Sequence, residues 1–223
     1  SVLVERAITE HAPSVHITSP GVGEEVEVGN VLNVTWTGSD DDGDDLTYRL
    51  AFSPDGGCTW VPIADELTDD AYGWNTGGLR PGQDYLVKVV VSDGYNSAEG
   101  VSDEFSMVDT APPATAISVE GEAGDNGWYT SKVAVAMNAT DNDRVDRTEY
   151  SIDDGEWSIY AGVINLTGEG NISIRYRSID ASGNVETAHT APVPIDLQGP
   201  SLQITDLMNG SKVNKGSVVH WTS

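Results

Sequence analysis

The segment Val31-Leu-Asn-Val-Thr-Trp-Thr37 alternates between apolar and polar side chains. Because successive side chains of a strand point to opposite faces, Leu32, Val34 and Trp36 share one face and the residues between them share the other. This pattern predicts a half-buried β-strand with Trp36 in the core. Tyr85-Leu-Val-Lys-Val-Val-Val91 predicts a second strong strand. No stretch of the sequence sustains the period of an amphipathic helix together with helix caps.

Strand-like segments continue along the whole chain, separated by Gly, Asp, Asn and Pro. We expect seven strands in each of two units, which predicts an all-β fold of tandem seven-stranded antiparallel β-sandwiches. In the first unit the expected strands lie near 14–18, 31–37, 46–52, 59–63, 71–75, 85–93 and 101–108. In the second unit they lie near 115–120, 132–139, 147–152, 156–160, 163–166, 170–180 and 185–195.

The sequence also repeats itself, because Pro13-Ser-Val-His-Ile-Thr18 returns as Pro200-Ser-Leu-Gln-Ile-Thr205. Self-similarity at long spacing indicates an array of stacked modules. The segments 1–11 and 199–223 would each be part of an incomplete module. Either the parent chain continues and supplies the missing strands, which we favour, or another copy adds them. The predicted division is a last strand of a preceding module in residues 1–11, module 1 in 12–110, module 2 in 111–198, and first strands of a following module in 199–223.

The composition is strongly acidic, with 11 Lys and Arg against 36 Asp and Glu and a formal net charge of −25. This balance argues against nucleic acid and anionic membrane surfaces as partners, because both require cationic contacts. It favours divalent cations or a high-salt environment. Cys58 is the single cysteine, so no intrachain disulfide is possible. No long apolar run is present, so we expect no direct membrane insertion, and targeting or anchoring segments would lie outside this fragment.

Several motifs resemble tandem immunoglobulin-like (Ig-like) or fibronectin III-like modules of large prokaryotic secreted surface proteins. They include Val34-Thr-Trp-Thr-Gly-Ser-Asp40, Val91-Ser-Asp-Gly94, Thr148-Glu-Tyr-Ser-Ile-Asp153 and Ser178-Ile-Asp-Ala-Ser-Gly-Asn-Val-Glu186. The resemblance implies Ig-like sandwiches that act as spacer, adhesion or assembly modules in archaea or bacteria. It assigns no catalytic residue, because sandwiches of this kind host many unrelated roles.

An Asp-box-like hairpin is predicted at Ser53, Asp55, Gly57, Thr59 and Trp60, whose spacing is similar to the Asp-box of sialidase-like propellers. There the motif is structural: Asp and Ser satisfy the turn amides and Trp packs beneath the turn. A shortened version is expected at Ser151–Trp157. Cys58, at a variable position of the first hairpin, is interpreted as a free, unreactive thiol.

The densest acidic cluster suggests a calcium site at Asp40, Asp42 and Asp44, because Ca²⁺ prefers several oxygen ligands. Gly43 allows a sharp turn there, and Asp93 is expected to approach from the end of another strand. The alternative is a solvated turn in which carboxylates cap backbone amides. A weaker analogue is expected in the second unit, at Asp141, Asp143 and Asp180.

Glycosylation and ligand contact are the remaining site predictions. Five N-glycosylation sequons begin at Asn33, Asn138, Asn165, Asn171 and Asn209. Alternation places Asn33, Asn138 and Asn171 on outer faces, as glycan attachment requires. Among the tryptophans, Trp128 beside Tyr129 is the candidate for an exposed ligand platform.

No arrangement of residues announces catalysis, because the four histidines are scattered and the carboxylates are too numerous for one acid–base pair to stand out. We therefore predict a non-enzymatic extracellular structural module of a repetitive, glycosylated cell-surface protein, such as a stalk, surface-layer (S-layer) or filament building block. The alternative is a set of adhesion or carbohydrate-binding accessory modules of a secreted enzyme. The expected partners are other copies or neighbouring modules of the same protein, and glycans.

Overall fold

The computed structural model describes residues 10–199, so the strands predicted at 2–8 and within 200–223 lie outside the described residues, as does Asn209. The described part of the chain is built from β-strands, with one short 3₁₀ turn, η1 (Asp125–Gly127). The strands form two β-sandwiches, which confirms the predicted all-β class.

Module 1 packs a three-stranded sheet, in the order β1-β3-β6, against a six-stranded sheet in which β2-β9-β7-β4-β5 is extended by β8 beside β7. Trp36, Val34 and Leu50 are buried between the sheets, so the alternation predicted around Trp36 is confirmed. The strands are β1 (Ser14–Ser19), β2 (Glu25–Glu27), β3 (Val31–Ser39), β4 (Thr47–Ser53), β5 (Val61–Leu67), β6 (Ala71–Asn75), β7 (Gly82–Ser92), β8 (Ser97–Val101) and β9 (Phe105–Val108).

Module 2 has the simpler sandwich, with sheets in the orders β10-β11-β14 and β13-β12-β15-β16. Val135, Ile174 and Val193 are fully buried between them. Seven strands were expected here and seven are present: β10 (Ala114–Glu120), β11 (Val133–Thr140), β12 (Val145–Ile152), β13 (Ser158–Ile159), β14 (Ile164–Leu166), β15 (Gly170–Asp180) and β16 (His189–Ile195).

The strand count of module 1 differs from the expectation, because residues 14–108 contain nine strands rather than seven. The strand predicted at 101–108 corresponds to β9, and the additional strand β8 ends at Val101, before β9 begins at Phe105. The buried hydroxyl of Ser102 accepts the N–H of Val87, and its own N–H donates to the Val87 carbonyl. The short β2 pairs with β9 in parallel, so the sheet is not purely antiparallel.

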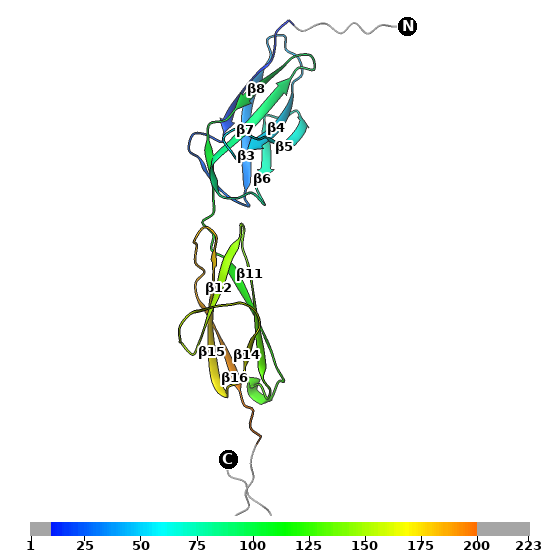
Figure 1. Ribbon diagram of the computed structural model, residues 1–223. Helices are drawn as coiled ribbons and strands as arrows, with labels where there is room; N and C mark the ends of the chain where they lie inside the picture. The colour runs from blue at the N-terminus through cyan, green and yellow to red at the C-terminus, as the bar shows by residue number, and fades with distance from the viewer. Residues whose placement is uncertain (1–9, 200–223) are drawn as a thin grey trace, which may run out of the picture.

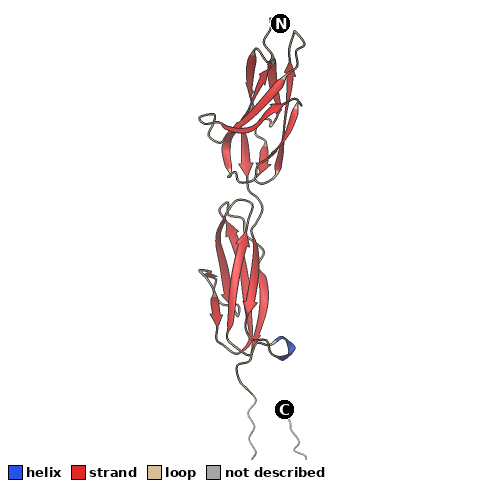
Figure 2. Cartoon of the chain, turned by 90° about the vertical axis from the view of Figure 1, so that its right-hand side faces the viewer, coloured by secondary structure: helices blue, strands red, loops and turns tan. Residues whose placement is uncertain are grey.

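The two modules follow one another end to end, with the connection at residues 109–113 between them (Figures 1 and 2). The strands run roughly along the long axis of the molecule, so strand ends and their turns gather where the modules meet. The predicted limits of the modules stay predictions, with one hydrophobic cluster on each side of this connection.

Candidate functional site

The acidic turn after β3 brings three predicted carboxylates together. One carboxylate oxygen each of Asp40, Asp42 and Asp44 lies within 4.8 Å of the others. Asp40 Oδ1 accepts the N–H of Asp42 at 2.9 Å and that of Asp44 at 3.4 Å, as in an Asx turn. Asp40 Oδ2 is buried without a hydrogen-bond donor. These clustered acids could bind a metal such as calcium.

Asp42 is also held by the segment preceding β1. Its carboxylate accepts the N–H groups of Glu10 and His11 and contacts His11 Nδ1 at 2.9 Å. The His11 hydrogen bond is the main cause that lowers the pKa of Asp42, and the same bond raises the pKa of His11. These bonds therefore hold Glu10 and His11, which precede β1, against the acidic turn that follows β3.

Asp93 lies directly after β7, and the structure leaves it outside the group of three aspartates. It is buried, and its Oδ1 accepts the N–H groups of Tyr95 and Asn96 at 2.6 and 2.5 Å. Asn96 in turn donates to the His11 carbonyl at 3.2 Å. Asp93 thus closes the β7–β8 turn. A cation shared by all four aspartates stays a prediction.

The Asp-box-like hairpin is closed by side-chain hydrogen bonds. Asp55 accepts the N–H of Thr59 at 2.8 Å, its hydroxyl at 2.7 Å and the Ser53 hydroxyl at 2.8 Å. Ser53 Oγ accepts the N–H of Gly57 at 2.8 Å. A Cβ at Gly57 would lie 3.7 Å from the Trp60 ring, so the indole packs against this turn. Cys58 is exposed and free.

The hairpin tryptophans are covered by cations from the neighbouring central strands. Lys88 Nζ, on β7, lies 4.3 Å from the Trp60 ring centroid. Arg177, on β15, lies 4.4 Å from the Trp157 ring. Cation–π contacts of this kind use the ring face that a sugar would need. Trp60 and Trp157 are therefore part of the sheet surface rather than ligand platforms.

The asparagines of four predicted sequons, Asn33, Asn138, Asn165 and Asn171, are exposed, and all four lie on strands. Their glycosylation stays a prediction.

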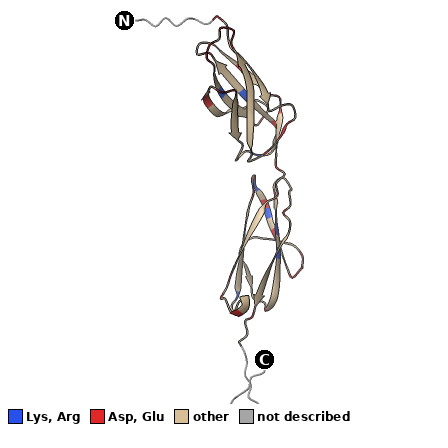
Figure 3. Ribbon diagram, turned by 180° about the vertical axis from the view of Figure 1, so that it is seen from behind, with Lys and Arg blue, Asp and Glu red and all other residues tan. Residues whose placement is uncertain are grey.

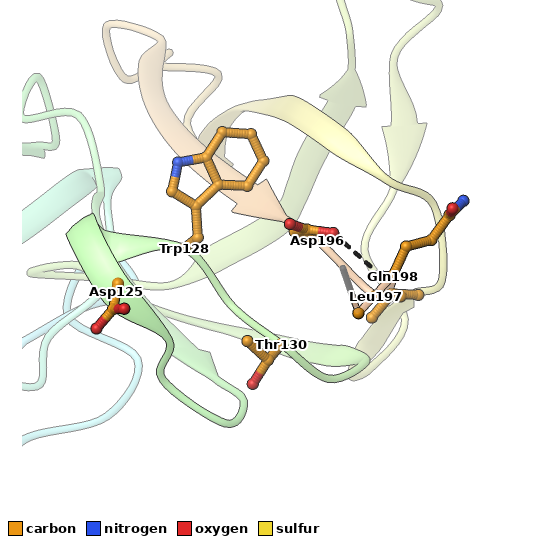
Figure 4. Close-up of a pocket in the computed structure, with 7 residues that line it drawn as sticks. Asp125, Trp128, Thr130, Asp196, Leu197 and Gln198 are labelled. Atoms are coloured by element: carbon orange, nitrogen blue, oxygen red, sulfur yellow. Dashed lines mark hydrogen bonds between the residues drawn. The ribbon is translucent and has the colours of Figure 1, made fainter. Parts of the chain in front are cut away.

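The predicted platform at Trp128 borders a cavity at the far end of module 2 (Figure 4). The cavity has a volume of about 550 Å³ and is lined by Asp125, Trp128, Thr130, Asp196, Leu197, Gln198 and Gly199. Trp128 is 38% exposed. Tyr129 does not line the cavity; it packs against the module 2 core, and its backbone bonds to Pro194 and Asp196.

A second group of aspartates lies where the two modules meet. Asp109 directly follows β9, Asp141 directly follows β11, and Asp180 ends β15. One carboxylate oxygen from each lies within 4.8 Å of the other two. Asp109 is 8% exposed and Asp180 is 2% exposed. Acidic residues recur in the loops and along the connection between the modules (Figure 3).

The junction is also joined by two asparagine side chains of module 2. Asn142 Nδ2 donates to Glu27 Oε1 and to the Val28 carbonyl, both at 3.1 Å. Asn184 Nδ2 donates to the Asp109 carbonyl at 2.9 Å and to Asp180 Oδ2 at 2.8 Å. These bonds connect side chains of module 2 to the backbone of module 1 and of the connection.

Glu27 anchors the connection itself. Its carboxylate accepts both the N–H and the hydroxyl of Thr110 as well as the Asn142 amide. Burial alone would raise the pKa of Glu27, but these hydrogen bonds lower it overall. A shallow hollow of about 430 Å³ at this junction is bounded by Glu27, Val28, Gly29, Asn30, Ala111, Pro112, Ala114, Thr140, Asp141 and Asn142.

Sequence analysis found Asp141 and Asp180 but missed Asp109, Asn142 and Glu27 as junction residues. Asp143, the third acid expected there, is not a member of the group and donates its N–H to Asp141 Oδ2 at 3.1 Å. A signal for Asp109 was available: it directly follows a strand, as Asp40 does, and it stands just before the Ala111-Pro connection.

No family model matches the chain, and no curated protein matches it. Solved structures resemble it in fold. The fibronectin(III)-like modules of Clostridium thermocellum CbhA are 16% identical over 85% of this chain and 100% of theirs, with a TM-score of 0.33. The N-terminal four Ig domains of Dscam1 isoform 6.9 are 11% identical, with 86% of this chain and 48% of that chain covered and a TM-score of 0.44.

Titin-A168169 is 8% identical over 82% of this chain and 98% of that chain, with a TM-score of 0.35. This chain spans about half the length of the Dscam1 structure. Likenesses at these identities concern the fold alone. By its own sheets and cores, the described part of the chain is a tandem of two β-sandwich modules. Within residues 10–199, no helix is long and apolar enough to cross a membrane.

Proposed function

We propose that this chain is a non-enzymatic spacer within an extracellular, glycosylated cell-surface protein, serving as part of a stalk, surface layer or filament. The observation that carries the proposal is the direct junction between the modules. Asn142 bonds to Glu27 and Val28 across it, and Asn184 bonds to the Asp109 backbone. Hydrogen bonds between modules restrain their relative motion, so the pair can hold a distance between its two ends.

Small-angle X-ray scattering of the 223-residue chain tests this role. An elongated monomer is the expected result, with a maximum dimension that Asn142→Ala combined with Asn184→Ala makes more variable. Asn171→Ala, an exposed asparagine at the opposite end of β15 from Asp180, is the matched control and should leave the scattering unchanged. A wild-type particle in which the modules fold back on each other would overturn the spacer role.

The partners of the spacer are other copies or neighbouring modules of the same protein. The isolated chain should sediment as a monomer, because each module has its own buried core. Concentration-dependent polymers that disappear on deleting residues 1–11 or 200–223 would support strand addition by another copy instead.

The alternative function is adhesion or carbohydrate binding as an accessory of a secreted enzyme. The observation that favours it is the cavity beside the partly exposed Trp128, because aromatic rings stack on sugars. Binding on a glycan array that Trp128→Ala abolishes would support this alternative. Intact-mass measurement of protein made in a glycosylating host tests the sequons at Asn33, Asn138, Asn165, Asn171 and Asn209.

A further inference from the structure

The junction contains three buried oxygen atoms without a hydrogen-bond donor. They are Asp109 Oδ2, Asp141 Oδ1 and Asn142 Oδ1. A buried polar atom in a folded protein is nearly always paired, because an unpaired one keeps its full desolvation cost. Asp109 is itself more than nine-tenths buried, so its unpaired oxygen is largely removed from bulk water. Three such atoms at neighbouring positions require an explanation.

The carboxylates of the junction also repel one another. Asp109, Asp141 and Asp180 each place an oxygen within 4.8 Å of the other two. Among the ion pairs of residues 10–199, none involves these three aspartates. Burial raises the pKa of Asp109 and the Asp141 and Asp180 carboxylates raise it further, whereas hydrogen bonds from Ser182 and Ala111 lower it in part. Without a positive charge at this position, repulsion among the carboxylates would lower the stability of the folded state.

The remaining oxygens of the group are already ordered. Asp109 Oδ1 accepts the N–H of Ala111 at 3.3 Å, and Asp141 Oδ2 accepts that of Asp143 at 3.1 Å. Both oxygens of Asp180 accept from Asn184 at 2.8 Å. The carboxylates are therefore held in place on one side by donors, which is how cation ligands are oriented in proteins.

We propose that a divalent cation, Ca²⁺, binds at the junction between Asp109, Asp141 and Asp180 and cross-links the two modules. Calcium bonds oxygens at about 2.3–2.6 Å, so its ligands can lie up to about 5 Å apart, in agreement with the spacing of these oxygens. Calcium is favoured over Mg²⁺ because Ca²⁺ accepts about six to eight oxygens in flexible geometry, whereas Mg²⁺ demands a near-ideal octahedron and usually keeps several waters. Asn142, the next residue after Asp141, adds a buried oxygen without a donor to the same junction.

The position of this site gives it a structural consequence. Asp109 belongs to the end of module 1, whereas Asp141 and Asp180 belong to module 2. A cation shared by the three fixes the connection and the relative orientation of the modules. The site shares with the proposed spacer role the geometry of the junction, but it rests on the aspartates rather than on the Asn142 and Asn184 hydrogen bonds. Its failure would leave an elongated tandem without metal-dependent stiffness.

Isothermal titration with CaCl₂ tests binding on the whole chain. Asp42→Asn serves as the background, because it removes the separate site predicted in module 1. This variant should retain one calcium per chain, with a dissociation constant in the range of about 0.1–1 mM found in extracellular modules. Adding Asp109→Asn or Asp141→Asn should weaken it at least about tenfold. The exposed Asp103→Asn is the matched control and should change nothing.

Thermal unfolding distinguishes a cation site from a merely structural cluster. If a cation binds, the effect of Asp109→Asn on the melting temperature should change sign between chelator and calcium. In chelator, Asp109→Asn should melt at or above the wild-type temperature, because one repelling charge is removed. In millimolar calcium it should melt below wild type, because the calcium-dependent gain is lost. A variant that melts lower in both conditions, or a wild type with equal melting in both, overturns the proposal.

Stiffening can be measured with spin labels on the free Cys58 and on a second cysteine at Glu156→Cys, one in each module. The distance distribution between the labels should narrow when calcium replaces chelator, and Asp141→Asn should abolish the narrowing. An unchanged distribution in wild type, or narrowing that persists in Asp141→Asn, would show that no cation joins the modules at this site.

Discussion

At the scale of the residue, the carboxylates of this acidic chain differ by the donors around them. Asp55 is saturated by Ser53 and Thr59, and these bonds lower its pKa. Asp109 is buried among other acids, and its pKa is raised. The same side chain thus closes a turn in one place and lies buried among other carboxylates with fewer donors in another, because burial and local donors set the pKa in each case.

Glu149 should contribute pH-dependent stability to module 2. It accepts Arg147 Nε at 2.9 Å and Arg177 Nη2 at 2.9 Å. The Arg147 bond is the main cause that lowers its pKa below the ordinary 4.5, aided by Arg177 and opposed by burial. A lowered folded-state pKa gives stability that is present above pH 4.5 and is lost as pH falls through the folded value.

Glu149→Gln should therefore reduce the free energy of unfolding by about 1 kcal/mol at neutral pH, and by less in acid. Urea unfolding at pH 7 and pH 3 measures both values. Glu156→Gln, an exposed acid of the same module, is the control and should have little effect at either pH. The same loss for Glu149→Gln at both pH values would contradict the ion-pair explanation.

The Asp-box-like hairpin should open locally when its central acid is removed. Asp55→Ala leaves the N–H of Thr59 without its acceptor, so amide exchange at Thr59 should become faster while exchange in β3 stays slow. Nuclear magnetic resonance of the amides measures this directly, with the exposed Asp69→Ala as control. Unchanged exchange at Thr59 would mean that the turn backbone alone holds the hairpin.

At the scale of the element, strand β3 carries the core of module 1. Trp36 is 2% exposed and packs edge-on against Tyr48, with ring centroids 5.3 Å apart. Tyr48 also lies close to the backbone of Gly38, two residues after Trp36 in β3, since a Cβ at Gly38 would collide with the Tyr48 hydroxyl. Glycine is required at this position for space rather than for backbone freedom.

Trp36→Ala should lower the free energy of unfolding by about 3–5 kcal/mol, the usual cost of deleting a buried aromatic side chain. Denaturant unfolding followed by circular dichroism measures the loss. Trp128→Ala is the matched control, because the same truncation at a partly exposed position should cost much less. Equal losses in the two variants would contradict the assignment of Trp36 to the core.

At the scale of the whole molecule, the net charge of −25 acts on both modules at once. Like charges repel most at low ionic strength, and salt screens them over about 10 Å at 0.1 M. The melting temperature in chelator should therefore rise as NaCl increases from near zero to about 0.15 M. A parallel titration with KCl should give the same curve, whereas a flat response would mean that ion pairs already offset the repulsion.

The sequence by itself determined the features that depend on neighbouring residues. Alternation over Val31–Thr37 determined which face of β3 is buried, and the spacing from Ser53 to Trp60 determined the hairpin, because both are set within a few residues. The seven strands of module 2 followed from the same local patterns. The three residues of β2 were too short to detect, and only the tertiary structure decided their parallel pairing with β9.

The sequence grouped Asp141 with Asp180, but only the tertiary structure decided that Asp109 joins them at the junction. Asp109, Asp141 and Asp180 are far apart in the sequence and meet only because the ends of β9, β11 and β15 are brought to the same place. Asp93 lies outside the group of three aspartates in module 1, and its Oδ1 accepts the backbone N–H groups of Tyr95 and Asn96. Local pattern specifies strands and turns, whereas contact between distant strand ends follows from how the sheets pack and the modules join.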